Sequence, residues 1–466
     1  MGRDVGGRAT TGWTRRRTVG MLGAWAGAVP LIAAAGGCGP ETGGGAPGAQ
    51  PAGGTGKKAI TLRWSPWDGE GQAIVDGANK GMALYKQSHP HVSFELIGQT
   101  GDFNPKVDAM IAAGDGPDVF GGNGAVWRDR AVQGQFLALD PLIKRDLKPA
   151  QIADYVEAHY KAFALPTTGQ FSLPMYLGTM GLYYNKGWFR ERGVQPPDEN
   201  WDWNTYRDAG VKLATPDQSV WARADVAASS MYRRFHQNGA NMVDPQDDTK
   251  AAFSSDKAIA ALSFERDTIQ KDRSTVIVAG PKQAPATVGL DQYQQINAGK
   301  IAMWEGGSFT LTRYMNMLGP EVDWDVAPLP KGPAGRFTLA TNDGWSIWSG
   351  TKAKDAAWEL LKFLQSDEWT DVATRIVGQQ SARKSFQQRW LAGIKEANPK
   401  MADKNLKPFA EAVEKNYARP IELFRKQVEA NTEFVNAYNK SVRDGDEEVA
   451  TSMKAAAELV NQINKS

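Results

Sequence analysis

The chain has 466 residues, a length that favours two or three structural units. Of these residues 41% are hydrophobic and 23% charged, a composition typical of a soluble globular protein. Its formal net charge is only +2, and no long basic run stands beyond the N-terminal region, which argues against a nucleic-acid-binding surface. One cysteine excludes an internal disulfide, and four histidines leave little for a zinc site.

The N-terminal region has the three parts of an export signal. Arg15-Arg16-Arg17 form a basic head, residues 19–37 are rich in Ala and Gly, and small residues lead to Cys38. We predict a signal over residues 1–37. The arginine pair resembles a twin-arginine signal, and Ala35-Gly36-Gly37-Cys38 resembles a lipobox, with Ala35 where leucine is usual. The alternatives are an uncleaved membrane anchor and a secretory signal with an incidental cysteine, although the glycines and the proline of residues 19–37 make a poor spanning helix.

A flexible tether is predicted over residues 38–56, because this segment is mostly Gly, Pro, Ala and Thr without apolar periodicity. Alternating and helical patterns follow in the order strand, helix, strand, helix, strand. They cover residues 60–64, 74–88, 92–96, a helix that starts at Asn104-Pro105 and ends at Gly114, and residues 117–120. This order predicts right-handed crossovers and a mainly parallel sheet.

The rest of the chain continues to alternate strands with helices. Helices are predicted at 151–164, 201–213, 256–271 and 291–298, and strands at 170–174, 181–185, 300–304, 323–328 and 343–348. Beyond Lys352 the pattern is mostly helical.

Five motifs in order resemble a known family. They are Ala112-Ala113-Gly114-Asp115-Gly116-Pro117-Asp118-Val119, Leu173-Pro174 with Leu182-Tyr183-Tyr184-Asn185-Lys186, Pro196-Pro197 with Trp201-Asp202-Trp203, Asn297-Ala298-Gly299-Lys300-Ile301-Ala302-Met303, and Ala327-Pro328-Leu329-Pro330-Lys331-Gly332. Together they resemble the extracellular solute-binding proteins of ABC importers, in particular the carbohydrate-associated family that includes the maltose-binding type.

The resemblance implies an α/β, two-lobed fold of the type II periplasmic-binding-protein kind. Each lobe is expected to hold a mainly parallel sheet flanked by helices, with a helical C-terminal region. Lobe 1 is expected to cover 57–166 plus 333–374, and lobe 2 to cover 167–332 plus 375–466. The chain is expected to cross between the lobes near 165–173, 328–332 and 372–378.

Candidate ligand residues stand at the predicted strand ends, where an aromatic ring, a polar or acidic side chain and glycine occur together. Aromatic rings stack on the apolar faces of a sugar, and polar side chains bind its hydroxyls. The candidates are Trp67, Asp68, Asn123, Tyr176, Trp304, Glu305, Asp343 and Trp345. The alternatives are packing roles for the tryptophans, of which the chain has 16, and solvated loop or helix-cap roles for Asp68 and Glu305.

Catalysis is not expected. Asp68 and Glu305 could be imagined as a glycosidase pair, but nothing in the sequence fixes their separation, and no nucleophile elbow, P-loop or His-Glu-x-x-His motif is present. His89-Pro90-His91 lacks a nearby third ligand, so neither a metal nor a cofactor is predicted.

The sequence therefore predicts an extracytoplasmic, monomeric receptor that is anchored to the membrane by a lipid on Cys38. It would capture a carbohydrate by closing two lobes and deliver it to the permease subunits of an ABC importer. The alternatives are a binding protein for a polyamine, a peptide or a glycerol-phosphate compound, an extracytoplasmic glycoside hydrolase, and, without lipidation, a periplasmic or secreted protein.

Overall fold

The computed structural model describes residues 58–66, 71–98, 103–225, 227–278, 291–320 and 322–465, which belong to the unit Lys57–Ser466. The predicted export signal and tether, Cys38, Trp67 and Asp68 lie outside the described residues. Within them, no helix combines the length and the apolar character needed to cross a membrane.

The first sheet has five strands in the spatial order β2-β1-β3-β15-β6. They are β1 (Ile60–Ser65), β2 (Val92–Leu96), β3 (Val119–Asn123), β6 (Leu173–Tyr176) and β15 (Asp343–Ile347). Strand β1 pairs in parallel with β2 and β3, as the strand–helix alternation predicted. Strand β15 comes from much later in the chain and lies antiparallel between β3 and β6.

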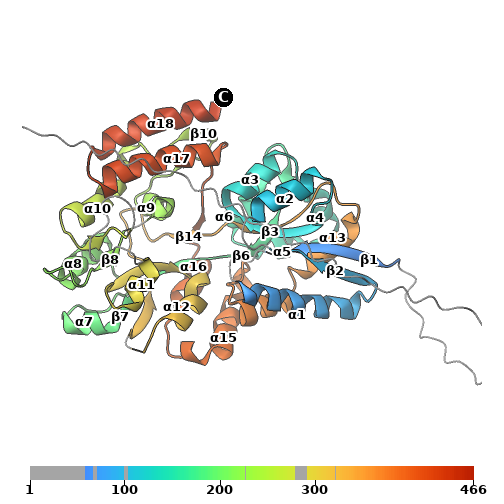
Figure 1. Ribbon diagram of the computed structural model, residues 1–466, viewed down its shortest axis with the longest axis horizontal. Coiled ribbons are helices and arrows are strands. Elements are labelled where there is room, and N and C mark those ends of the chain that lie inside the picture. Colours follow the sequence, from blue (N-terminus) through green and yellow to red (C-terminus); the bar gives the residue numbers. More distant parts are fainter. Residues whose placement is uncertain are drawn as a thin grey trace, which may run out of the picture. The chain divides into compact units, whose positions relative to one another are not determined.

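Helices cover both faces of this sheet (Figure 1). They include α1 (Gln72–Ser88), α2 (Phe103–Ala112), α3 (Gly124–Val132) and α13 (Lys354–Phe363). Because side chains alternate along a strand, Val119 packs in one core with Trp64, whereas Phe120 packs in another with Trp127 of α3.

The second sheet has three strands in the order β12-β7-β13, and both pairings are antiparallel. The strands are β7 (Met180–Asn185), β12 (Met303–Gly307) and β13 (Trp324–Ala327). This differs from the mainly parallel sheet expected in each lobe. Strands β12 and β13 are joined through α12 (Leu311–Met317) and run in the same direction as each other, which the strand–helix alternation predicts. Strand β7 lies between them and is antiparallel to both.

Four two-stranded pairs complete the β-structure of the described residues. Strands β8 and β11, and β14 and β16, pair in parallel, whereas β4 and β5, and β9 and β10, pair antiparallel. Their bounds are β4 (Ala164–Leu165), β5 (Gly169–Gln170), β8 (Arg223–Ala224), β9 (Val243–Asp244), β10 (Asp247–Ala251), β11 (Thr275–Val276), β14 (Thr338–Ala340) and β16 (Ala418–Pro420).

The chain beyond Lys352 is mostly helical, as predicted. Among the remaining α-helices, those predicted at 201–213, 256–271 and 291–298 are present, two short helices replace the one predicted at 151–164, and those that begin at residues 140, 186 and 231 were not predicted. The remaining α-helices are α4 (Asp140–Asp146), α5 (Pro149–Ala153), α6 (Glu157–Lys161), α7 (Lys186–Glu191), α8 (Trp203–Leu213), α9 (Met231–Gln237), α10 (Asp256–Gln270), α11 (Gln292–Asn297), α14 (Asp367–Val372), α15 (Gln387–Ala397), α16 (Lys407–Glu414), α17 (Gln427–Tyr438) and α18 (Val449–Lys465). Helices α9, α10, α17 and α18 enclose a core of their own around Phe235, Phe434 and Met453.

Three segments meet next to the first sheet, at a place that we call the hinge region (residues 177–180, 338–342 and 379–382). The first follows β6, the second leads into β15, and the third follows the helical residues 367–377. Leu177 N donates to the carbonyl of Gln380 at 3.0 Å, and Gly178 N donates to Thr341 Oγ1 at 2.9 Å. The backbone of Met180 both donates to and accepts from Thr338 Oγ1. Strand β6 pairs with β15, so the chain stays in the first sheet up to Tyr176, beyond the expected boundary at residue 166.

Candidate binding site

Three of the predicted ligand residues lie in one row across the first sheet. Asp343 at the start of β15 is in register with Asn123 at the end of β3 and with Tyr176 at the end of β6. Asn123 is partly exposed, whereas Tyr176 is 6% and Asp343 0% exposed. The row therefore offers an accessible amide at the sheet edge nearest the hinge region, with an acid and a phenol buried beside it.

Trp345 lies two residues further along β15 and is buried in the core. Its ring is 5.9 Å from that of Trp64 and 6.2 Å from that of Trp369, measured between centroids. With 0% exposure, it has no ring face free for a sugar. The expected ligand role is therefore corrected to packing, because alternation along β15 directs this side chain inward.

Trp304 and Glu305 lie inside β12 rather than after a strand, because β12 extends to Gly307 instead of ending at residue 304 as predicted. The strand pairs with β7 along this whole length. Trp304 stacks on Tyr183 at 5.7 Å and is 1% exposed. Nearly all of the Trp304 ring is buried in the core, so packing explains this tryptophan, which was expected to stack on the ligand.

Glu305 belongs to a buried group of five charged side chains, which we call the arginine–glutamate cluster. Its members are Arg223, Arg233, Arg234, Glu265 and Glu305, each at most 5% exposed. They come from β8, α9, α10 and β12, so four elements converge on them.

The carboxylate of Glu305 is shared between two arginines. It accepts hydrogen bonds from Arg233 and Arg234, and a third at 3.2 Å from the hydroxyl of Tyr206. Glu265 pairs with Arg223 at 2.8 Å and also with Arg234. Glu305, which was expected to accept hydrogen bonds from the hydroxyls of a ligand, therefore already accepts them from two arginines.

The two carboxyl groups of the cluster stay ionised because arginines of the same cluster pair with them. Burial disfavours the charged carboxylates, yet Arg223 and Arg234 lower the pKa of Glu265 to about 2. Arg233 and Arg234 likewise hold the pKa of Glu305 below its usual value against the effect of burial. Both acids are charged at neutral pH.

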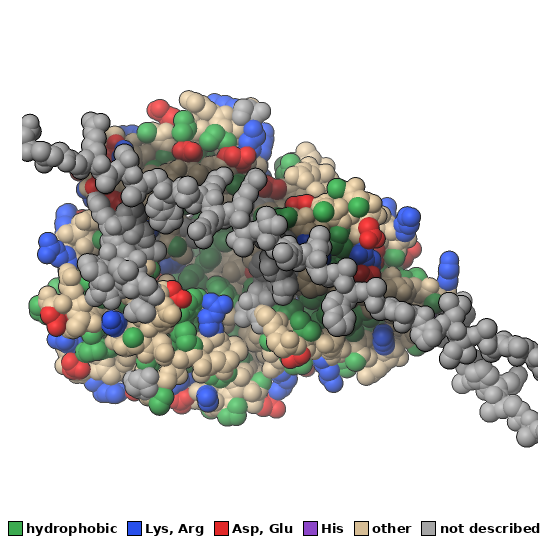
Figure 2. Space-filling model, viewed as in Figure 1, with side chains coloured by type: hydrophobic (Ala, Val, Ile, Leu, Met, Phe, Trp, Pro, Cys, Tyr) green, Lys and Arg blue, Asp and Glu red, His purple; other side chains and the backbone are tan. Residues whose placement is uncertain are grey.

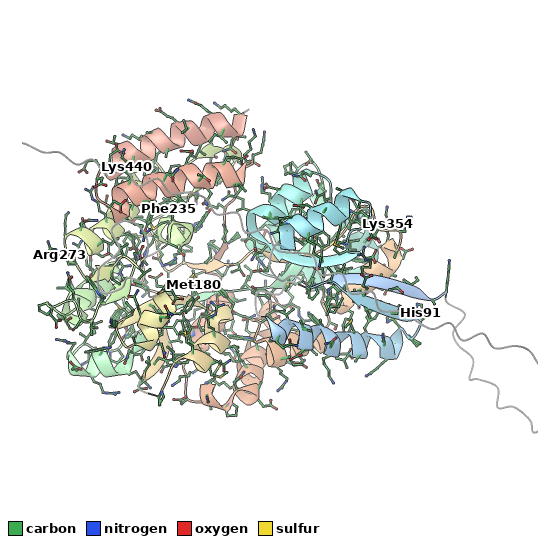
Figure 3. The ribbon with its side chains drawn as sticks, viewed as in Figure 1. His91, Met180, Phe235, Arg273, Lys354 and Lys440 are labelled. Atoms are coloured by element: carbon green, nitrogen blue, oxygen red, sulfur yellow. The ribbon has the colours of Figure 1, made fainter. Side chains whose placement is uncertain are left out.

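A pocket of about 90 Å³ opens beside the cluster, and we call it the β12 pocket. Its lining includes Met180, Tyr206, Arg223, Arg233, Trp304 and Glu305. Figure 3 labels Met180 at the start of β7 and Phe235 on α9, the two elements on either side of this region. Since Met180 also bonds Thr338, the pocket adjoins the hinge region.

Sequence reasoning missed Arg223 and Arg233. The available signal was Arg233-Arg234 between the apolar residues Met231-Tyr232 and Phe235, since paired arginines in such a segment need partners if they are buried.

A larger groove of about 800 Å³ lies between α3, the β4–β5 turn, the β9–β10 hairpin and residues 422–425. None of the described predicted ligand residues lines it. Arg128 of α3 bonds Asp248 of β10, and Arg425 bonds the same carboxylate at 3.2 Å. Figure 2 shows charged side chains of both signs dispersed over one face of the molecule, without a broad patch of one sign.

In the described part of the chain, no three His, Cys, Asp or Glu residues are grouped so that they could hold a metal ion. His89 stacks on Tyr85 at 4.1 Å, which gives it a packing role.

Two sheets linked by three hydrogen-bonded segments, with a pocket beside the linkage, define the architecture of a two-lobed, type II periplasmic binding protein. Residues 64–371 match the model of the bacterial extracellular solute-binding proteins, and the chain belongs to this family. A binding protein from Brucella abortus is 23% identical over 201 residues, which make up 43% of this chain. The chain spans about half the length, 47%, of that curated relative.

Solved structures show the same fold. An ABC substrate-binding protein from Listeria monocytogenes in complex with cycloalternan is 20% identical, with a TM-score of 0.71 over 87% of this chain and 99% of its own. The sugar-binding protein MalE from Xanthomonas citri is 18% identical, with a TM-score of 0.70 over 87% and 98%. UgpB from Mycobacterium tuberculosis, in complex with glycerophosphocholine, is 19% identical, with a TM-score of 0.68 over 88% and 98%.

Proposed function

We propose that this solute-binding protein captures a carbohydrate between its two lobes and delivers it to the permease subunits of an ABC importer. The observation that carries the proposal is the position of the β12 pocket, whose lining residue Met180 is bonded to the hinge region. Closure about such a hinge brings the opposite lobe onto whatever occupies the pocket. A ligand that contacts both lobes only in the closed form shifts the population toward that form.

A carbohydrate suits the chemistry of this region. Asn123 offers an amide at the edge of the first sheet, and the β12 pocket combines aromatic and charged side chains. Such mixtures bind both the apolar faces and the hydroxyls of a sugar. The sugar-binding neighbours from Listeria and Xanthomonas support the same ligand class.

The lobes are proposed to be divided about as the sequence predicted, with the first crossing moved to residues 177–180. Trp67 and Asp68 are retained as proposed ligand residues because they follow β1, whose end pairs with β3. Attachment through a lipid on Cys38, an extracytoplasmic location and a monomeric state also belong to the proposal.

A non-enzymatic role agrees with the state of Glu305. The acid of a glycosidase must be protonated near neutral pH, which requires a raised pKa. The pKa of Glu305 is instead lowered by two arginines, so this carboxyl is a poor proton donor.

A glycerol-phosphate compound is the second candidate, because the β12 pocket contains Arg223 and Arg233 and the mycobacterial neighbour is a complex with glycerophosphocholine. Phosphate oxygens suit guanidinium groups.

A thermal-shift screen tests the assignment, using mono- and oligosaccharides, polyamines, peptides and glycerol 3-phosphate. We expect a saccharide to stabilise the protein without being cleaved, and Trp67→Ala to reduce that shift while the melting temperature without ligand is unchanged. Stabilisation only by a polyamine, a peptide or glycerol 3-phosphate would refute the carbohydrate assignment, and release of a smaller sugar would show a hydrolase.

A further inference from the structure

The arginine–glutamate cluster has an unbalanced charge. Its three guanidinium groups oppose two carboxylates, which leaves one positive charge among side chains that are at most 5% exposed. A buried charge without a counter-charge is costly, and proteins normally pair it. The imbalance therefore calls for an anion close to the cluster.

Arg223 has an unused donor at this place. Its Nη2 donates to Thr268 Oγ1 at 2.5 Å and pairs with Glu265, and its guanidinium lies 5.2 Å from the ring centroid of Tyr206. Its Nη1 is buried and has no hydrogen-bond partner among the described residues. Arg223 lines the β12 pocket, so an acceptor bound in the pocket could take this bond.

The other acids of the pocket do not supply the missing charge. Glu305 is shared by Arg233 and Arg234, and is already counted in the cluster. Asp225 pairs with Arg443 at 2.7 Å and accepts a hydrogen bond from Val278 N at 3.0 Å. The surplus at the pocket is therefore positive even when both acids are ionised.

The size of the pocket limits what fits. Sites that enclose a whole small-molecule ligand have volumes of roughly 300–1,000 Å³, whereas the β12 pocket has about 90 Å³. It has room for one substituent of a ligand whose remaining atoms lie outside it.

We propose that the β12 pocket binds the anionic substituent, a carboxylate or a phosphate, of an acidic saccharide, with Arg223 Nη1 and Arg233 as its donors. This inference rests on the proposed carbohydrate-binding function and specifies the class of sugar. The substituent neutralises the cluster when it binds, which makes an acidic sugar a better ligand than its neutral counterpart.

The test compares matched ligands by isothermal titration calorimetry on the unmodified protein. D-glucuronate and D-galacturonate provide a carboxylate, glucose 6-phosphate provides a phosphate, and D-glucose and D-galactose are their neutral counterparts. Glycerol 3-phosphate and inorganic phosphate carry the anion without a sugar ring. We expect at least one acidic sugar to bind about tenfold or more tightly than its neutral counterpart.

A charge placed in the pocket lining provides the matched variants. Ala227 is exposed and lines the pocket, so its replacement leaves the buried cluster intact. Ala227→Glu should weaken binding of the acidic sugar about tenfold or more by repulsion, while Ala227→Gln, of similar size, should weaken it much less. Equal melting temperatures of the two variants without ligand would show that both fold.

The outcomes separate the two proposals. Equal affinity for acidic and neutral sugars, or an equal loss in both variants, would overturn this inference and leave carbohydrate binding in place. Binding of glycerol 3-phosphate but of no sugar, sensitive to Ala227→Glu, would overturn both the carbohydrate assignment and the acidic saccharide, and would favour the glycerol-phosphate alternative. Binding of no anionic compound would overturn the inference.

Discussion

The hydroxyl of Thr179 donates to Oε1 of Gln380 at 2.8 Å, and both side chains are fully buried in the hinge region. The amide nitrogen of Gln380 donates to Gln387 Oε1 at 2.9 Å and to the carbonyl of Phe409 at 3.0 Å. One glutamine thus joins segments that are about two hundred residues apart in sequence, since Thr179 and Gln380 are separated by 201 positions.

Replacing Gln380 by methionine should destabilise the protein by about 2–3 kcal/mol, because Thr179, Gln387 and Phe409 lose a partner inside the structure. Urea denaturation measures this change. Gln388→Met, on the exposed side of α15, is the control and should cost less than about 0.5 kcal/mol. Similar stability of both variants would contradict the role given to Gln380.

Gly81 of α1 should not tolerate a methyl group. A Cβ at this position would lie 2.5 Å from the Trp369 ring, so Gly81→Ala should cost about 1–3 kcal/mol through overpacking. The control is Gly210→Ala in α8, where the nearest atom would be at 3.5 Å. That change should stabilise the protein by about 0.5–1 kcal/mol, because alanine favours the helix. Thermal unfolding should show a lower melting temperature for Gly81→Ala and a higher one for Gly210→Ala. A change of the same sign in both variants would contradict the packing argument.

Glu422 should make stability fall as pH rises through neutrality. Burial raises the pKa of its carboxyl to about 7, against the lowering effect of hydrogen bonds from Met242 N and Val243 N. The folded protein therefore holds this proton more tightly than the unfolded chain. The resulting stability is complete below the usual carboxyl pKa and is lost as pH rises through about 7.

Glu422→Gln tests this prediction by urea denaturation between pH 6.5 and 8.5. The variant should lose the downward slope and exceed the parent at pH 8.5 by on the order of 1–2 kcal/mol. His236, 3.3 Å from Glu422, has a pKa lowered by burial from 6.5 to about 4, so its opposing contribution grows mainly between these two pH values and is nearly complete over most of the tested range. An unchanged slope in the variant would rule out Glu422 as the source.

Asp248 should help to hold the two lobes in the arrangement described here. It bonds Arg128 of α3 and Arg425 of the segment before α17. Asp248→Asn should change the free energy of unfolding by less than about 1 kcal/mol, because its ion pairs are partly exposed. It should nevertheless increase the radius of gyration of the ligand-free protein, which small-angle scattering measures. Asp247→Asn, whose ionic partner Lys250 belongs to the same strand, is the control. No difference between the two variants would argue against a restraint by Asp248.

Much of the fold could be predicted because local signals agree with tertiary structure. Asp202 caps α8 by accepting from Thr205 N at 2.8 Å, and the expected start of this helix is confirmed. The direction of the second sheet could not be predicted. Periodicity identifies β7, β12 and β13 separately, but it does not show that β7 pairs between the other two.

The candidate site was less accessible to sequence reasoning. The row of Asn123, Asp343 and Tyr176 follows from strand-end positions, and the register brings the three together. Trp345 and Trp304 are buried, and the sequence could not predict this. An aromatic residue near glycine gives the same sequence pattern whether its ring faces a ligand or the core. The arginine–glutamate cluster depends on contacts between residues as distant as Arg233 and Glu305, which only the folded chain reveals.

The place of β15 between β3 and β6 has a consequence for how the protein is made. While the ribosome is still synthesising residues before Asp343, β3 and β6 lack the strand that joins them. The first sheet therefore cannot be completed early in translation, and long-range pairings of this kind slow folding. A nascent chain that ends before β15 would expose unpaired strand edges, so it would depend on chaperones until most of the polypeptide has emerged.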